Sequence, residues 1–444
     1  MFKRKIYDEL VEWKSKFGPK YATMIEGPRR VGKSTVAEEF AKNEFKSYIK
    51  IDFANITKRM EDVFTDLADL GTFFRRLQLE TGVVLYKGES VIIFDEIQKA
   101  PLVRQAIKHL VADGKYYYIE TGSLISIKKN VKDIVLPSEE HKIQMYPMDY
   151  EEFLWATGNQ TYSLLRDIYK TGKPVGETNR KLVRDFRKYM AVGGMPQAVA
   201  SYVNGDSFEE IDRIKREIIE LYKDDFRKID SSGRISQMFE SIPGQLSAEK
   251  KRYVISNALN KRTTDKDKER LADLLDSKTV IASYNTTDPG VSLNLTRDDT
   301  AYKLFLADTG LFVTLLFNDE SKVHADIYSK LLRDRLNINL GYIYENVAAQ
   351  MIAASGRKVY YHTWKKEGTT HSYEVDFLLT SETKVIPLEI KSSSVRFYNS
   401  ISAFEKKYSS RVGKQYILSQ KDVDRKENLY FKPIYMLPFI LEDL

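Results

Sequence analysis

The segment GPRRVGKS (Gly27–Ser34) limits the possible folds of this chain more than any other feature, because its pattern works in only one local structure. It matches the phosphate-binding pattern G-x-x-x-x-G-K-[S/T] at every position. An apolar run that predicts a buried strand precedes it, and AEEFAKNEF, which suits a helix, follows it. The two glycines let the backbone curl so that N–H groups face an anion, and the helix N-terminus adds a positive end. The segment therefore predicts a strand, a phosphate-binding loop and a helix in succession.

The chemistry of a bound nucleotide assigns roles within this loop. We expect Lys33 to reach the β- and γ-phosphates of ATP and Ser34 to hold Mg²⁺. The predicted nucleotide-binding residues are Gly27, Pro28, Arg29, Arg30, Val31, Gly32, Lys33, Ser34 and Thr35. The alternative is a Gly-rich surface turn, and the flanking strand and helix argue against it.

VIIFDEI (Val91–Ile97) supplies the second half of a nucleotide site. Its apolar residues predict a buried strand, and two carboxylates end it. Asp95 is expected to bind Mg²⁺ through water, and Glu96 to polarise the attacking water. An adjacent Asp-Glu pair fits ATP hydrolysis better than phosphorylation of a small molecule. A solvated strand end is the alternative.

Two further roles in hydrolysis are less well defined by the sequence. Thr121 or Ser123, at the end of the next predicted strand, is a candidate sensor of the γ-phosphate, with a Ser/Thr turn as an equal alternative. Candidates for an arginine that stabilises the transition state are Arg29 and Arg30 in the loop and Arg104 in the helix after the Asp-Glu pair. The sequence does not favour one of them.

Predicted strands and helices alternate along the first part of the chain. The strands are 21–27, 47–53, 91–97 and 116–124, with helical patterns at 1–17, 57–81 and 100–114. This order predicts a parallel sheet with helices on both faces. From about residue 145 the segments are mostly helical, and Lys266–Thr287 indicates a helix, a short strand and a polar turn. With the preceding helices, this segment could form a winged-helix unit.

The C-terminal part carries a second set of chemical groups. Asp376 lies in one predicted strand, and Glu389 and Lys391 lie in the next. A turn at SETK joins the two strands into a predicted hairpin. Asp-x(n)-Glu-x-Lys is the metal-binding signature of restriction-endonuclease-like domains. Two carboxylates on adjacent strands hold divalent ions that activate a water, and the lysine positions it. Glu389 and Lys391 share a strand face, because side chains alternate along a strand.

Glu345, on a predicted helix over residues 341–355, is a further candidate ligand of this site. The predicted metal ligands are therefore Ser34, Asp95, Glu345, Asp376 and Glu389, and the predicted catalytic residues are Lys33, Glu96, Asp376, Glu389 and Lys391. The alternatives for the C-terminal set are a half-exposed hairpin with alternating charges, or a nuclease fold that has lost activity.

These segments together make the chain resemble bacterial and archaeal AAA+-type ATPases with a C-terminal domain of unknown function that has a restriction-endonuclease-like motif. The resemblance rests on GPRRVGKS (27–34), VIIFDEIQKAP (91–101), ETGS (120–123), YPMDYEEF (146–153), GGMP (193–196), ADTGL (307–311), YENVAAQ (344–350), EVDFLL (374–379) and LEIKSS (388–393). It implies a nucleotide site at Gly27, Gly32, Lys33, Ser34, Asp95 and Glu96, and a nuclease-like set of Glu345, Asp376, Glu389 and Lys391. Position 120 departs from the pattern, because it is Glu where an apolar strand residue is more usual.

We therefore expect an α/β fold with three domains. They are a P-loop NTPase parallel sheet flanked by helices (1–145), a mostly helical, winged-helix-like middle region (146–325) and an α/β restriction-endonuclease-like C-terminal domain (326–444). The final apolar segment Ile434–Leu441 is too short to span a membrane, is interrupted by Pro438, and is expected to be a docked strand.

Composition excludes several classes of site. The chain has no cysteine, which rules out disulfides, thiolate zinc sites, iron–sulfur clusters and a cysteine nucleophile. Its net charge of +7 permits contact with nucleic acid without requiring it. No run approaches the ~20 apolar residues of a membrane span, so we expect a cytoplasmic protein without a membrane partner.

Two functions remain open from the sequence. The first is an ATP- and Mg²⁺-dependent enzyme that acts on, or is regulated by, nucleic acid such as DNA through the nuclease-like domain. The second is a nucleotide-gated switch that binds a protein partner or another copy of itself, with the nuclease-like fold as an inactive scaffold.

Overall fold

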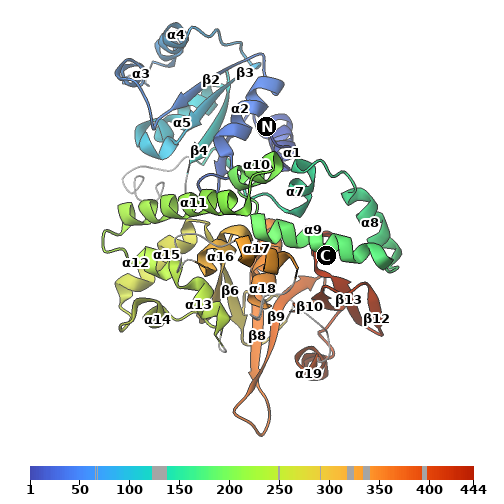
Figure 1. Cartoon of the computed structure of the whole chain (residues 1–444). Coiled ribbons are helices and arrows are strands. Elements are labelled where there is room, and N and C mark those ends of the chain that lie inside the picture. The colour runs from blue at the N-terminus through green and yellow to red at the C-terminus, as the bar shows by residue number, and fades with distance from the viewer. Residues whose placement is uncertain are drawn as a thin grey trace. The chain divides into compact units, whose positions relative to one another are not determined.

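The computed structural model describes residues 1–65, 67, 69–122, 138–248, 251–290, 292–317, 325–333, 341–392 and 398–444. These residues form two compact units, both visible in Figure 1. Unit 1 contains Met1–Pro147, Asp224–Ser231 and Asp276–Lys278, and unit 2 contains Met148–Lys223, Ser232–Leu275 and Thr279–Leu444. The division into three domains stays a prediction.

Within its described residues, unit 1 contains a five-stranded parallel sheet with the order β2-β3-β4-β1-β5. Its strands are β1 (Ala22–Glu26), β2 (Ser47–Asp52), β3 (Ser90–Asp95), β4 (Tyr117–Gly122) and β5 (Glu140–Gln144). Its helices are α1 (Ile6–Lys16), α2 (Lys33–Glu44), α3 (Lys58–Val63), α4 (Leu70–Thr81) and α5 (Pro101–Asp113). The predicted alternation of strands and helices is confirmed. Strand β5 was not predicted, because its sequence EHKIQ has no apolar run.

Helices cover both faces of this sheet. One face shares a hydrophobic core with α3, α4 and α5, to which Phe94 of β3, Leu77 and Ile107 contribute. The other face meets α1 and α2, where the rings of Trp13 and Phe40 lie 6.5 Å apart. Figure 1 shows α2 and α5 on opposite sides of the strands. Strands β1 and β3 are buried along their whole length, as expected for parallel strands that are covered on both faces.

Unit 2 begins with helices and ends with a large sheet. Its helices are α7 (Tyr150–Ala156), α8 (Tyr162–Thr171), α9 (Asn179–Val192), α10 (Pro196–Asn204), α11 (Phe208–Ile229, whose C-terminal part belongs to unit 1), α12 (Arg234–Glu240), α13 (Ile242–Ser247), α14 (Ile255–Leu259), α15 (Asp265–Asp276), α16 (Thr309–Leu316), α17 (Ala325–Leu332), α18 (Gly341–Ala354), α19 (Asn399–Tyr408) and α20 (Leu437–Glu442). Its strands are β6 (Val280–Thr286), β7 (Arg297–Leu306), β8 (Val359–Lys365), β9 (Ser372–Ser381), β10 (Lys384–Ile390), β11 (Gln415–Ser419), β12 (Asp424–Lys426) and β13 (Leu429–Pro433). Short 3₁₀ turns lie at Ile97–Lys99, Gly176–Thr178 and Ile434–Met436.

The strands of unit 2 form a mixed sheet with the order β12-β13-β11-β10-β9-β8-β6-β7 among the described residues. The predicted hairpin is confirmed as the antiparallel pair β9 and β10. The strand predicted within Lys266–Thr287 is β6, and it pairs with β8 of this C-terminal sheet. It therefore belongs to the same sheet as the C-terminal strands rather than to the sheet of a separate winged-helix unit.

The prediction of a final docked strand is wrong. Residues Ile434–Met436 form a 3₁₀ turn, and α20 follows it, with Pro438 in its first turn. Proline suits the first turn of a helix, because the N–H that it lacks has no partner within the helix there. Burial of Leu437, Phe439, Ile440 and Leu441 holds this helix in place. Among the described residues we find no helix whose length and hydropathy would let it traverse a lipid bilayer.

The GGMP and ADTGL segments pack directly on each other. Asp308 is buried and accepts hydrogen bonds from the backbone N–H of Gly194 at 2.6 Å and of Leu311 at 2.8 Å, which caps α16. A Cβ at Gly193 would collide with the Asp308 carboxylate, and one at Gly310 would collide with the Val192 carbonyl oxygen. The glycines are therefore required so that two backbone segments can approach this closely.

Helix α18 joins the same contact through two polar side chains. The Asn346 carbonyl oxygen accepts the Leu306 N–H at 2.9 Å, and the Gln350 carbonyl oxygen accepts the Thr309 N–H at 2.8 Å. The Gln350 amide also donates to the Tyr189 hydroxyl at 2.9 Å. The motif YENVAAQ thus satisfies buried backbone groups, which would otherwise destabilise the fold.

We expect Gly310→Ala to destabilise the protein by about 1–3 kcal/mol, because the added methyl group overpacks a contact between two backbones. The matched control is Gly244→Ala in α13, whose added Cβ meets nothing within 4 Å. That helical substitution should be neutral or stabilising by up to about 1 kcal/mol. Chemical denaturation of both variants measures the difference. Equal stability of the two variants would contradict the interlocked packing.

Candidate functional site

The loop between β1 and α2 has the backbone shape that its sequence predicts. Gly32 has a φ of +98° at the N-terminus of α2, a left-handed value that favours glycine. Gly27 has a φ of +157°, and a Cβ there would collide with the Met145 carbonyl oxygen. Arg30 also has a positive φ, of +69°. The loop therefore curls tightly around the start of α2, where backbone N–H groups are available to an anion.

Lys33 lies at the centre of this loop. Its ammonium group is buried and donates to the carbonyl oxygens of Gly27 at 3.0 Å and Pro28 at 2.8 Å. Burial lowers the pKa of Lys33 to about 8, against the opposing charges of Glu96 and Asp95. A lysine in this environment gains strongly from an additional anionic partner, such as a phosphate group.

Asp95 at the end of β3 collects the other predicted groups. Its carboxylate is buried and accepts a hydrogen bond from the Ser34 hydroxyl at 2.7 Å and another from the Thr121 hydroxyl. The Lys50 ammonium lies 3.6 Å from the same carboxylate. Ser34, Asp95 and Thr121 are thus brought together from three separate segments.

Lys50 was not predicted as part of this site. Strand β2 pairs in parallel with β3, with Asp52 opposite Asp95 and Lys50 opposite Ile93. Alternation along the strand therefore puts the side chain of Lys50 on the same face as that of Asp95. Lys50 lies two positions before Asp52 in the sequence, but only the pairing of β2 with β3 shows that this places it beside Asp95. Lys50 also binds Glu38 of α2 at 3.0 Å.

The remaining predicted residues of unit 1 have mixed outcomes. Glu96 has a φ of +56° and accepts a hydrogen bond from the Gln98 amide. Of the two candidate sensors of the γ-phosphate, Ser123 lies outside the described residues. Thr121 is described, and its hydroxyl donates a hydrogen bond to Asp95. The Arg29 guanidinium binds Asp225, in the C-terminal part of α11, at 3.0 Å.

Arg104 does not suit the role of a transition-state arginine. Its side chain is 1% exposed and makes a two-point contact with Glu140 of β5, at 3.1 and 3.0 Å. Removing either partner of such a buried pair leaves an uncompensated charge. Arg104 is therefore committed to holding α5 against the sheet.

The unusual Glu120 belongs to the same buried group. It is fully buried on β4, and neither carboxyl oxygen has a hydrogen-bond partner among the described residues. Burial raises the pKa of Glu120 well above its usual range, the charge of Glu140 raises it further, and Arg104 opposes both. The raised pKa favours the neutral, protonated form of Glu120 in the folded chain, which explains how β4 tolerates it.

Mg²⁺ fits the arrangement at Asp95. The Ser34 hydroxyl and the Asp95 carboxylate are adjacent oxygen donors, the ligand type that Mg²⁺ prefers. These two groups come from the loop–helix junction and from the end of a central strand. They are therefore positioned by the rigid parts of unit 1.

The predicted C-terminal residues also lie near one another. Glu345 of α18, Asp376 of β9 and Glu389 of β10 are all buried. Burial raises the pKa of both Glu345 and Glu389, and the nearby Asp376 charge raises each further. Asp376 accepts the Ile390 N–H at 2.8 Å. The three carboxylates therefore interact electrostatically.

A strand irregularity lies beside Asp376. In the pairing of β8 with β9, His362 is opposite Val375 and Tyr360 is opposite Leu378, so three steps along β9 match two along β8. Bulges of this kind change the direction of a side chain and are common next to functional sites.

Lysines accompany these carboxylates, and two of them were not predicted. Lys391 binds Glu389 at 2.5 Å, as its place in the motif suggests. Lys303 of β7 binds Glu374 at 2.6 Å and lies 3.8 Å from Glu345. Lys251 donates a hydrogen bond to Glu345. Lys251 and Lys303 are far from the motif in sequence, and only the sheet brings them to it.

One observation favours a metal ion at Glu345, Asp376 and Glu389, and another argues against it. Glu345 and Glu389 each have one buried carboxylate oxygen without a hydrogen-bond partner among the described residues. Such oxygens suit a divalent cation. In the described part of the chain, however, no group of three or more His, Asp or Glu side chains is arranged to hold a metal ion. The acids are present, and lysines supply the positive charge beside them.

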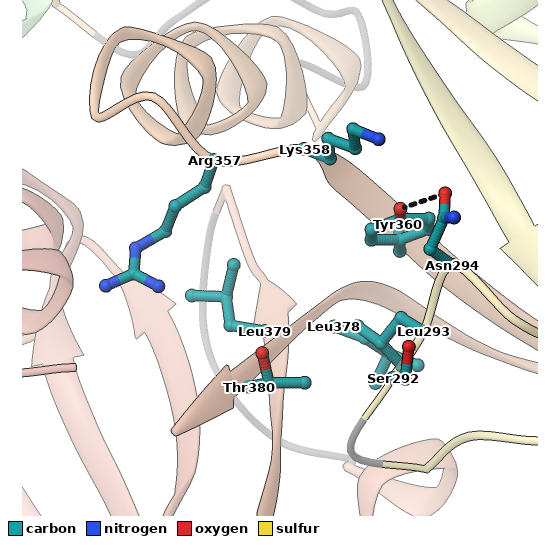
Figure 2. Close-up of a pocket in the computed structure, with 9 residues that line it drawn as sticks. All are labelled: Ser292, Leu293, Asn294, Arg357, Lys358, Tyr360, Leu378, Leu379 and Thr380. Atoms are coloured by element: carbon teal, nitrogen blue, oxygen red, sulfur yellow. Dashed lines mark hydrogen bonds between the residues drawn. The ribbon is translucent and has the colours of Figure 1, made fainter. Parts of the chain in front are cut away.

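A separate pocket of about 260 Å³ lies in unit 2 and is shown in Figure 2. Tyr360 lines it and donates a hydrogen bond to Asn294 at 3.2 Å, while Arg357 and Lys358 come from the turn between α18 and β8. The described residues that line it include none of the predicted site residues. The pocket is therefore distinct from the carboxylate set.

Family models match three segments of the chain. Residues 19–154 match a model described as an AAA domain. Residues 183–322 match a domain of unknown function, DUF8612, and residues 340–437 match another, DUF4143. The N-terminal part is thus a P-loop ATPase domain of the AAA type, followed by two domains whose models carry no functional description. No curated protein matches the chain.

Solved structures give only distant similarities. Cdc6p from Pyrobaculum aerophilum is 13% identical, with 75% of this chain and 93% of that chain covered and a TM-score of 0.23. The RuvB Holliday junction branch migration motor of Thermotoga maritima is 11% identical, with 63% and 89% covered and a TM-score of 0.27. A STAND ATPase with a tetratricopeptide repeat sensor from Pyrococcus horikoshii is 13% identical, with 80% and 45% covered and a TM-score of 0.28. Similarities this low carry no argument about this protein.

The buried acid of β4 makes stability depend on pH. Because its folded-state pKa is raised, the folded chain keeps a proton on Glu120 at pH values where the unfolded chain has lost it. The free energy of unfolding therefore falls as pH rises above about 4.5, by at most about 1.4 kcal/mol per pH unit. Glu120→Gln should remove this loss, so its stability relative to wild type should grow with pH.

Denaturation between about pH 5 and pH 8 tests this expectation. The control is Glu177→Gln, a substitution of an exposed acid, which should show no such trend. If the free energies of unfolding of wild type and Glu120→Gln changed with pH in the same way, the raised pKa of Glu120 would be contradicted.

Proposed function

We propose that this protein binds and hydrolyses ATP at the loop between β1 and α2. The observation that carries the proposal is the meeting of Ser34, Asp95 and Thr121 beside the buried Lys33. A phosphate-binding lysine, a hydroxyl with a carboxylate for Mg²⁺, and an adjacent glutamate are the groups that phosphoryl transfer to water requires.

Each residue has a separate task in this proposal. Lys33 and the backbone N–H groups of the loop would bind the phosphates, and Ser34 and Asp95 would hold Mg²⁺, which would supply positive charge against the phosphate groups. Glu96 follows Asp95 at the strand end and orients the attacking water. Thr121 of β4 donates a hydrogen bond to Asp95 and is the candidate sensor of the γ-phosphate. Arg29 and Arg30 remain the candidates for stabilising transition-state charge.

Lys33→Ala should lower the rate of ATP turnover by about 100-fold or more, because phosphate charge loses its main cationic partner. Steady-state phosphate release measures the effect. The control is Lys16→Ala, which removes an exposed lysine paired with Glu12 on α1 and should leave turnover unchanged. Undiminished hydrolysis by Lys33→Ala would rule out this site.

A second activity, metal-dependent cleavage of DNA in unit 2, has specific support. Glu345 and Glu389 each have a buried carboxylate oxygen that accepts no hydrogen bond among the described residues, both lie in the acid set around Asp376, and Lys391 lies beside Glu389. Mg²⁺ or Mn²⁺ held there would lower the pKa of a water, and Lys391 would steady the developing charge. The competing function is the nucleotide-gated switch, in which the nuclease-like fold is an inactive scaffold. The ion pairs that lysines form with these carboxylates favour this alternative.

One assay separates these two functions. Plasmid and single-stranded DNA are incubated with the full chain and Mg²⁺ or Mn²⁺, with and without ATP. If unit 2 is a nuclease, Asp376→Ala should abolish cutting and keep ATP turnover, because the two sites have no residues in common. Loss of cutting in Lys33→Ala as well would mean that ATP controls cleavage. No cutting under any condition would leave the switch as the function.

A further inference from the structure

The carboxylates of unit 2 already have their own cations. Glu345, Glu374 and Glu389 are met by the ammonium groups of Lys251, Lys303 and Lys391. Acids taken out of water require such compensation, because burial of an unpaired charge is very unfavourable. A divalent ion entering this set would therefore compete with lysines that are already present.

Lys303 is a fixed member of this set. Its side chain is 1% exposed, it lies in the middle of β7, and its ammonium group lies 4.8 Å from the centre of the Tyr361 ring. The charges of Glu374, Glu345 and Asp376 raise the pKa of Lys303 despite the opposite and largest effect, burial. Lys303 is therefore favoured in its charged form and has almost no exposure to solvent.

Lys251 differs from Lys303 in two respects. Its side chain is 28% exposed, and its backbone lies in an irregular segment before α14 rather than in a strand. The Tyr253 N–H donates to the Tyr302 carbonyl oxygen at 2.8 Å, which holds the backbone of this segment beside β7. The Lys251 ammonium group can therefore leave Glu345 by side-chain rotation, with its backbone in place.

We propose that Lys251 is a built-in competitor for metal at the C-terminal carboxylates. It binds the Glu345 carboxylate, whose second oxygen is buried, accepts no hydrogen bond among the described residues and lies 3.8 Å from Lys303, and so takes the place of a divalent cation. Lys251 would have to swing away from Glu345 for these carboxylates to hold a metal ion, and Lys303 would remain as the permanent counter-charge. This inference rests on the proposed metal site of unit 2 and is independent of the ATP site.

Binding of Mn²⁺ alone to the nucleotide-free full chain tests the competition. Free Mn²⁺ is measured by electron paramagnetic resonance at about pH 8, because binding of a metal ion to carboxylates strengthens as pH rises. Lys251→Met should bind the Asp376-dependent Mn²⁺ roughly tenfold more tightly than wild type, because one positive charge has left the site. Lys251→Gln, a neutral polar variant, should behave like Lys251→Met and serves if the latter does not fold.

Two controls isolate the effect of charge at this position. Lys251→Arg keeps the positive charge and should bind Mn²⁺ as weakly as wild type does. Lys268→Met removes an exposed lysine that pairs with Asp265 on α15, and should also match wild type. Asp376→Asn, alone and combined with Lys251→Met, defines the binding that belongs to unit 2 rather than to the loop around Lys33.

The possible results separate the competition from the metal site itself. Tighter binding in both neutral variants, lost when Asp376→Asn is added, supports the proposal. Asp376-dependent binding that is equal or weaker in Lys251→Met overturns the competition and leaves the metal site standing. Absence of Asp376-dependent Mn²⁺ binding in every variant overturns the metal site and the competition together, whereas ATP turnover stays as proposed.

Discussion

A carboxylate removed from water must receive hydrogen bonds or a cation, and this requirement organises each part of the structure. Asp95 is satisfied by the hydroxyls of Ser34 and Thr121, which draws the loop before α2 and the end of β4 toward β3. Asp308 is satisfied by backbone N–H groups, which holds two glycine-containing segments together. Glu345 is satisfied by a lysine from a distant segment. Glu120 accepts no hydrogen bond among the described residues, and burial raises its pKa instead, which favours its neutral form.

The hydrogen bonds to these carboxylates show which sequence motifs maintain the fold and which could take part in chemistry. GGMP and ADTGL have the appearance of functional signatures, and their glycines and aspartate are explained by the close approach of two backbones. In YENVAAQ the two kinds of role lie on one helix. Asn346 and Gln350 of α18 satisfy buried backbone groups, while Glu345, directly before Asn346, faces the C-terminal carboxylates. The position of Glu345 is therefore fixed by the packing that its two neighbours on the helix maintain.

The two candidate sites differ in how their charge is balanced. At Asp95 the partners are mainly neutral hydroxyls, with Lys50 at 3.6 Å, so the carboxylate keeps much of its capacity to attract a cation. At Glu345, Glu374 and Glu389 the partners are ammonium groups at ion-pair distances. A metal ion gains from the first arrangement directly, and it must displace a charge in the second. This difference explains why the ATP site has the stronger physical basis of the two.

The sequence by itself determined the local units: the strand, loop and helix around Lys33, the buried strand that ends at Asp95, and the hairpin that carries Asp376 and Glu389. Each depends on a short pattern in which periodicity and turn residues act within a few positions. The sequence did not determine β5, whose EHKIQ has no apolar run, or the final helix, where Pro438 lies in the first turn of α20. It also could not identify Lys50, Lys251 or Lys303 as partners of the buried acids. Only the tertiary structure decided these, because strand register and sheet order bring together residues that no local periodicity relates.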